Sequence, residues 1–268
     1  MLHFLTTGWR HRSLLMRLAR REFEARYRGS ALGVAWAALL PLVMIGIYTF
    51  VFTHVMRTRW VVSAETTESV YSFAMLMFTG YILFSFFADA IGRAPGLMLE
   101  NPSYIKKVVF PLEVLPWVAV VNALIGAGIA LAVFMVLFLL LYGLPPLTIL
   151  LLPFVVTPLV LITLGATYFL ASFGVFLRDL RQFIPLITTA LLFLSPVLYP
   201  LGAVPERFRA IISLNPLTIG VTEARQVIFW GEVPNLAEWG LYTVAGVLLA
   251  SLGHWWFMRT KKAFADVV

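Results

Sequence analysis

The chain alternates long apolar runs with short polar segments, and the polar segments hold most of the charged residues. A helix that crosses a bilayer takes roughly 20 apolar residues. Runs of about this length cover residues 32–55, 70–91, 115–142, 147–177, 183–201 and 239–257. No Asp, Glu, Lys, Arg or His occurs from Val114 to Leu177, which is too long for one crossing, so we expect a reversal near Gly143–Pro146. The pattern predicts an all-α membrane protein with six transmembrane helices.

The first 30 residues have a different pattern, with seven arginines and no run long enough to span a bilayer. Wound as a helix, the apolar residues form one arc and most arginines form the other, and only Glu22 and Arg26 interrupt the apolar arc. This is typical of a helix that lies at a membrane interface. A basic flank without a specific ligand is the alternative. We therefore expect an amphipathic interfacial helix over 1–30 and a single six-helix transmembrane domain over 31–268.

The connection between the last two runs, residues 202–238, is unusual because it combines Pro205, Pro216 and Pro234 with a moderately apolar centre. Apolar runs too short to span a membrane are often re-entrant or interfacial. Irregular backbone at membrane depth survives where protein or a water-filled path surrounds it. We expect a re-entrant segment on the periplasmic side, with a plain periplasmic loop as the alternative.

The distribution of Lys and Arg predicts the orientation. Of the 20 such residues, fifteen lie on the side of the N-terminus if six helices cross, and five lie on the other side. Cytoplasmic segments of membrane proteins carry this excess. Both termini are therefore expected in the cytoplasm. The formal charge of +7 is explained by these basic edges, so we expect membrane lipids as neighbours and no nucleic acid as a partner.

Several kinds of chemistry are not supported. Cysteine is absent, the four histidines pair with no carboxylate at ligand spacing, and no lysine follows a glycine as a phosphate-binding loop requires. We expect no metal site, no catalytic residue and no ATPase site in this chain. Asp89, His54 and His254 lie near span ends, which argues against an ion-coupled carrier. A lipid-modifying membrane enzyme is a second alternative function, but the acidic residues are too sparse to suggest one.

Aromatic residues are abundant, with 22 Phe, 8 Trp and 9 Tyr. Sugar rings have apolar C–H faces that fit aromatic rings, so Tyr81, Phe84 and Phe87 in the second span and Tyr168 in the fourth are candidate walls of a sugar path. Helix packing or contact with lipid is the alternative for each.

Several segments spread over almost the whole chain resemble the permeases of ABC-2 type polysaccharide exporters, nearest to those for O-antigen and teichoic acid. The matching segments are residues 21–33 followed by Trp36 and Pro41, residues 101–111, 176–181, 195–200 and 215–218, and residues 259–266.

The resemblance implies a homodimer docked on two ATPase subunits that bind ATP and Mg, with no cofactor bound by this chain. It also implies export of a polysaccharide linked to undecaprenyl pyrophosphate across the bacterial inner membrane. Capsule or teichoic acid polymer, or a drug or small lipid, is the alternative cargo.

Candidate residues fall into two sets. Arginine pairs bidentately with phosphate oxygens, which makes the clustered arginines candidates for the lipid pyrophosphate. With the aromatic candidates, and Trp36 and Tyr199 from the matching segments, the substrate set is Arg20, Arg21, Arg26, Arg28, Trp36, Tyr81, Phe84, Phe87, Tyr168 and Tyr199. The set expected to contact the ATPase, or else to serve only as topological charge, is Asn101, Ser103, Tyr104, Lys106, Lys107, Arg178, Asp179 and Arg181. Gly29 and Gly33 are spaced as residues that let two helices approach closely.

Overall fold

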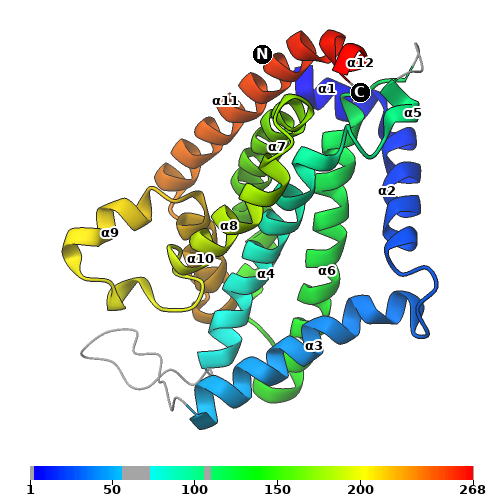
Figure 1. Cartoon of the computed structure of the whole chain (residues 1–268). Helices are drawn as coiled ribbons and strands as arrows, with labels where there is room; N and C mark the ends of the chain where they lie inside the picture. The colour runs from blue at the N-terminus through cyan, green and yellow to red at the C-terminus, as the bar shows by residue number, and fades with distance from the viewer. Residues whose placement is uncertain (1–2, 56–72, 106–109, 268) are drawn as a thin grey trace.

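The computed structural model describes residues 3–55, 73–105 and 110–267, and within these ranges the regular structure is helical (Figure 1). Among the described residues, five helices are long and apolar enough to cross a membrane, over Gly33–Phe52, Phe73–Gly96, Val114–Tyr142, Leu147–Phe176 and Leu236–Ala263. Each overlaps a predicted span with ends that differ by a few residues. The prediction of an all-helical membrane protein is confirmed.

The N-terminal segment forms two helices, α1 (His3–Arg10) and α2 (Arg12–Arg26), instead of one helix that reaches residue 30. The buried Leu15 and Ala19 of α2 pack on Val114 and Val118. Figure 1 shows α2 running beside α6 (Val114–Tyr142). The apolar arc of α2 therefore packs against the helix bundle.

The first candidate span joins a 3-10 turn, α3 (Trp36–Thr49) and the π-helical turn Phe50–Val55. It runs obliquely past α4 (Phe73–Arg93) and α6 (Figure 1). The α4 helix is the most buried of the spans. It is followed by the turn η3 (Ala94–Gly96) and by α5 (Pro102–Ile105).

The predicted reversal after α6 is confirmed, because Gly143 ends the helix with φ of 82°. Only glycine adopts such an angle readily. The chain returns through η4 (Leu147–Leu151) and α7 (Leu152–Phe176). The long helix α11 (Leu236–Thr260) packs along α7, and η7 (Lys261–Ala263) and α12 (Phe264–Val267) end the chain.

The fifth predicted span differs from the structure. The α8 helix covers Leu180–Phe193, which at 1.5 Å per residue is about 21 Å and shorter than a hydrocarbon core of about 30 Å. Pro196 and Pro200 follow it, and proline can neither donate a backbone hydrogen bond nor let the preceding residue stay helical easily. The run 183–201 is therefore divided between a short helix and a turn.

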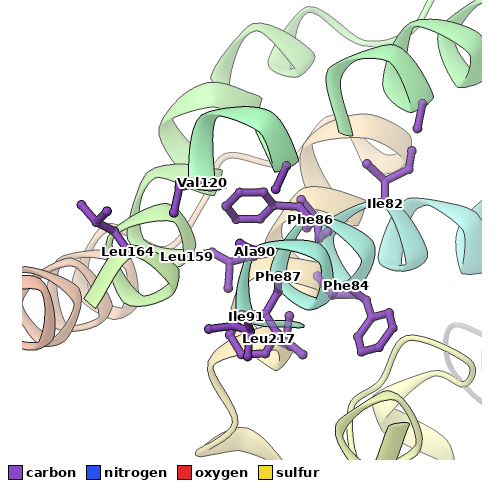
Figure 2. Packing of buried hydrophobic residues seen from close by; sticks show 14 of the residues in the cluster. Ile82, Phe84, Phe86, Phe87, Ala90, Ile91, Val120, Leu159, Leu164 and Leu217 are labelled. Carbon is purple, nitrogen blue, oxygen red and sulfur yellow. The ribbon is translucent and has the colours of Figure 1, made fainter. Parts of the chain in front are cut away.

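The segment after α8 contains η5 (Leu201–Ala203), α9 (Glu206–Ser213), α10 (Pro216–Arg225) and η6 (Gln226–Trp230). Asn215 caps α10 by accepting a hydrogen bond from the backbone amide of Leu217 at 3.0 Å. The α10 helix packs on α4 and α7 and contributes to the main core. Figure 2 shows this core around α4, with Phe84 and Phe86 on opposite sides of the helix, and the same cluster includes Leu217 of α10.

Candidate functional site

The two polar residues that interrupt the apolar arc of α2 hold this helix to the bundle. Glu22 accepts a hydrogen bond from Asn122 Nδ2 at 3.0 Å and forms an ion pair with Arg93. Arg26 donates to both carboxylate oxygens of Asp89, at 3.0 and 3.2 Å. Asn122 is only 1% exposed. Because charge-assisted hydrogen bonds at half-buried sites are stronger than those in water, these contacts fix α2 against α4 and α6.

The four arginines proposed for the pyrophosphate differ in their surroundings. Arg20 pairs with Glu24 one turn later on the same helix at 2.8 Å, and this pair is solvent-exposed. Arg21 donates to the hydroxyl of Tyr104 at 2.5 Å. Arg28 is exposed, and Arg26 forms the ion pair with Asp89 described above. Two acidic neighbours thus offset part of the positive charge of the set, and its role at the pyrophosphate stays a prediction.

The two segments predicted to contact the ATPase lie together at one end of the bundle. Arg181, at the start of α8, donates to the carbonyl of Gly96 at 3.1 Å and pairs with Glu100 at 3.0 Å. A Cβ on Gly96 would lie 2.8 Å from the Arg181 guanidinium and 2.7 Å from the Glu100 carboxylate, so a larger residue would displace this ion pair. Arg178 and Asp179 are exposed in the same turn.

Tyr104 connects the two sets of candidate residues. Its ring stacks on Phe110 with centroids 4.2 Å apart, and it accepts the hydrogen bond from Arg21 of α2. Asn101 donates to the carbonyl of Leu97 at 2.9 Å, which orders the chain before α5. Ser103 is exposed. Lys106 and Lys107, also predicted to face the ATPase, lie outside the described residues.

Three of the aromatic candidates are packed inside the subunit. Phe84, Phe87 and Tyr168 are buried in the main core, and the Tyr168 hydroxyl donates to the carbonyl of Glu113 at 2.9 Å. Figure 2 shows Phe84 and Phe87 on α4 among neighbouring helices. Their burial favours the packing alternative over a role as walls of an open path.

The other three aromatic candidates are partly exposed. Tyr81 has an edge-to-face contact with Tyr48 at 5.5 Å, and the Tyr199 hydroxyl donates to the carbonyl of Phe193 at 2.9 Å. Trp36 begins α3 and is half-buried. Their proposed contact with sugar stays a prediction.

The sequence interpretation missed a buried arginine at the end of α10. Arg225 is 4% exposed, and it donates to three backbone carbonyls, of Leu76 at 2.9 Å, Pro196 at 2.6 Å and Val197 at 2.9 Å. Two of these carbonyls lie in the turn that ends α8, where proline has removed helical hydrogen bonds. The guanidinium of this α10 residue therefore links α10 to α4 and to the turn after α8.

A buried glutamate, also missed, lies two residues before it. Glu223 is 4% exposed, and within the described residues neither of its carboxylate oxygens has a hydrogen-bond partner. Burial, with a smaller contribution from Glu238, raises the pKa of Glu223 to about 7. The available signal was the placement of Glu223 and Arg225 between the apolar residues 217–221 and 227–229.

Comparison with known proteins agrees with this architecture. The ABC-2 type transporter family matches residues 13–229. The chain is 29% identical to an O-antigen export system permease protein RfbA of Myxococcus xanthus, with 100% of both chains covered. It is 27% identical to the protein of the same name from Klebsiella pneumoniae over 95% of each chain, and 22% identical to the polysialic acid transport protein KpsM of Escherichia coli over 80% of each. The family match extends from α2 through η6 and includes four of the five long apolar helices, so the chain belongs to the ABC-2 type transporter family.

Proposed function

We propose that this chain is the transmembrane subunit of an ABC transporter that exports polysaccharide of the O-antigen type, linked to undecaprenyl pyrophosphate, across the inner membrane. The observation that carries this proposal is the similarity over the full chain to relatives named as O-antigen export permeases. ATP and Mg are bound by a separate subunit, and this chain binds no cofactor. Two copies of the chain form a homodimer that docks on two ATPase subunits.

Stimulation of ATP hydrolysis tests the cargo. The purified permease and its ATPase partner, reconstituted together, are expected to hydrolyse ATP faster with an O-antigen type glycan on undecaprenyl pyrophosphate than with the lipid carrier alone. Stimulation only by a capsule-type polymer would favour the second candidate, for which the match to KpsM is the supporting observation. A response to small lipids or drugs but to neither polymer would refute both.

We also propose six crossings, with α8 as a short fifth crossing and α9 and α10 as a re-entrant segment on the periplasmic side. The packing of α10 on α4 and α7 supports this, as does the position of both termini at one end of the molecule (Figure 1). With the positive-inside bias, that end is cytoplasmic. Residues 1–30 then form the interfacial unit, and residues 31–268 form the transmembrane domain.

Single cysteines test this orientation, because the chain has none of its own. Leu144→Cys lies in the α6–α7 turn, where Leu144 is 89% exposed, and Ser103→Cys lies at the opposite end. The reagent is a maleimide that cannot cross the inner membrane, applied to intact cells whose outer membrane has been permeabilised. It is expected to label the Leu144→Cys variant directly and the Ser103→Cys variant only after lysis. The reverse pattern would refute the orientation.

The contact with the ATPase is proposed for α5 and for the turn before α8. Support comes from the ion pair of Arg181 with Glu100, which joins the two segments, and from Tyr104, which connects α5 to α2. Ser103→Cys and Arg178→Cys are expected to cross-link to cysteines on the ATPase surface, and Leu144→Cys is the matched control that should not. Failure of every pair at the α5 end would count against this assignment.

The arginines of α2 are proposed to attract the pyrophosphate of the lipid carrier. Replacing Arg20, Arg21, Arg26 and Arg28 together with Ala is expected to reduce export strongly at unchanged protein level. Asp89→Ala is the matched control, because it removes the same ion pair to α4 and keeps all four cations. Equal loss of export in both variants would assign the effect to the ion pair and refute the role in attracting pyrophosphate.

A further inference from the structure

An open groove of about 1180 Å³ lies between α1 and the second half of α11, at the end of the molecule that holds both termini. The groove has a fixed shape because α1 is anchored. Phe4 is fully buried, its carbonyl accepts a hydrogen bond from Trp117 Nε1 at 3.2 Å, and Thr7 Oγ1 lies 3.4 Å from His254 Nε2. The arginine helix α2 and the aromatic candidates discussed above take no part in its lining.

The α11 wall is apolar and continues beyond the groove. Leu241, Val244, Leu248, Leu252 and Trp255 follow one another at intervals of three or four residues, so they share one face of the helix. Each of them is between 49% and 75% exposed. The last three line the groove, and the first two extend the same stripe along the span. This face offers a continuous apolar surface to a long hydrocarbon chain.

The α1 side and the end of the groove are polar and mainly basic. Arg10, His3 and His11 line this part. The acidic residue of the lining is Glu113, and its charge is offset by an ion pair with Lys261 at 3.1 Å. The net charge presented to a ligand is therefore positive.

The rim of the groove has the composition of a membrane–water interface on both sides. Trp9 is 73% exposed with the guanidinium of Arg12 5.1 Å from its ring centroid, and Trp255 is flanked by Arg259 at 5.2 Å. Tryptophan concentrates at the level of lipid headgroups, and basic pockets beside membrane helices bind anionic headgroups. Arg12, the first residue of α2, and Arg259 of α11 thus each place a cation beside a tryptophan of the rim.

We infer that this groove binds an anionic glycerophospholipid of the surrounding bilayer. Arg10, with His11 next to it in the chain and His3 at the other end of α1, holds the phosphate and headgroup, and the acyl chains lie along the exposed stripe of α11. The bound lipid fastens α1 to α11 and so stabilises the position of the adjoining helix α2. This site is separate from the cargo site proposed above, which uses the arginines of α2.

Native mass spectrometry of the purified full chain tests the inference, with palmitoyl-oleoyl phosphatidylglycerol and the matching phosphatidylcholine as probes. The wild type is expected to retain phosphatidylglycerol in preference to phosphatidylcholine. Arg10→Ala is expected to weaken phosphatidylglycerol binding about fivefold, since one basic residue near an anionic headgroup contributes on the order of 1 kcal/mol. Arg17→Ala, an exposed arginine on α2, is the matched control and should leave binding unchanged.

A second pair of variants tests the apolar wall without changing charge. Leu252→Trp places a bulky side chain on the apolar wall inside the groove and is expected to reduce retention, whereas Leu241→Trp, on the same stripe but outside the groove, should retain the lipid. Equal retention of both lipids by the wild type, or wild-type retention by both Arg10→Ala and Leu252→Trp, would overturn the inference. Displacement of phosphatidylglycerol by an equimolar polyprenyl pyrophosphate would also overturn it, because the groove would then belong to the cargo.

Discussion

Replacing Arg225 with Met should destabilise the protein strongly. Methionine is shorter than arginine but has a similar volume, so the substitution removes the charged donors and leaves most of the volume filled. The carbonyls of Leu76, Pro196 and Val197 then lose a donor in a buried setting. A buried polar group left without its partner costs about 1–3 kcal/mol.

The expected loss follows from these three contacts. Three buried carbonyls left without a donor cost about 3–9 kcal/mol together at about 1–3 kcal/mol each. Relief of the arginine's desolvation penalty offsets part of this cost, so we expect a net loss of about 3–5 kcal/mol. With roughly 2–4 °C per kcal/mol for a chain of this size, the melting temperature should fall by about 10 °C. Arg225→Lys keeps the charge but lacks the geometry for three carbonyls, so it should restore only part of the stability.

Thermal unfolding in detergent, followed by intrinsic tryptophan fluorescence, measures this effect. Arg209→Met is the matched control in the same segment, because Arg209 donates to the carbonyls of Val204 and Gly202 at 2.8 and 3.1 Å from a half-exposed position. It should cost about 1 kcal/mol. Equal melting temperatures for Arg225→Met and Arg209→Met would refute the reasoning that burial of the three contacts makes Arg225 important.

Three further predictions, one of them with a control variant, concern other positions. Glu223→Gln should remove one contribution to the pH dependence of stability. Because the folded pKa of about 7 lies above the unfolded value of 4.5, the stabilising contribution of Glu223 is largest below about pH 4.5 and falls by about 2–3 kcal/mol as pH rises through 7. Melting curves at pH 5 and 8 measure this, and a variant with the same pH dependence as the wild type would contradict it. Gly174→Ala should be strongly destabilising because its Cβ would collide with the backbone of Pro95, whereas Gly128→Ala, with open space around it, should be neutral or slightly stabilising in the same assay. Asn122→Leu removes the hydrogen-bond donor to Glu22 and should weaken the docking of α2. We expect faster proteolysis after Arg26 with little change in melting temperature. Unchanged cleavage would mean that the apolar contacts alone hold α2 in place.

The spans could be predicted from sequence because the bilayer constrains a crossing helix through its length and its apolar composition. The run 115–142 needed no knowledge of a partner helix, and the structure places α6 within one residue of it. The run 183–201 is shorter but is also about as long as a span requires, and Pro196 and Pro200 end helical structure after Phe193. Hydropathy does not register the lost backbone donors, which are what shorten α8.

Close helix contacts could not be predicted from spacing. Gly29 and Gly33 have φ of 84° and 52°, and among the described residues no atom lies within 4 Å of where a Cβ would be, so the prediction that they bring helices together is wrong. They form the turn between α2 and α3. The close approach occurs instead between Gly165 of α7 and Gly253 of α11. Nothing in a single sequence indicates which two helices are neighbours, and so which glycines meet.

The candidate site was predictable where charge stands out against an apolar background, and less so where partners are distant in sequence. The arginines of α2 are visible in the sequence, but their pairing with Asp89 and Tyr104 depends on residues more than 60 positions away. Glu22 was apparent only as an interruption of an apolar arc. Its role in holding α2 is visible only in the structure, where Asn122 and Arg93 contact it.

These contacts give α4 a particular position in the molecule. Near its C-terminal end, Asp89 and Arg93 hold α2, and near its other end the carbonyl of Leu76 accepts from Arg225. The 21 residues of α4 extend about 31 Å, so one rigid, buried helix is bonded to the arginine helix at one end and to the broken segment at the other. A shift of α2 that exceeds the reach of these side chains and still keeps the ion pairs must move α4. Because Arg225 binds α4 and the turn after α8 together, the same shift reaches the segment that we propose shapes the periplasmic side.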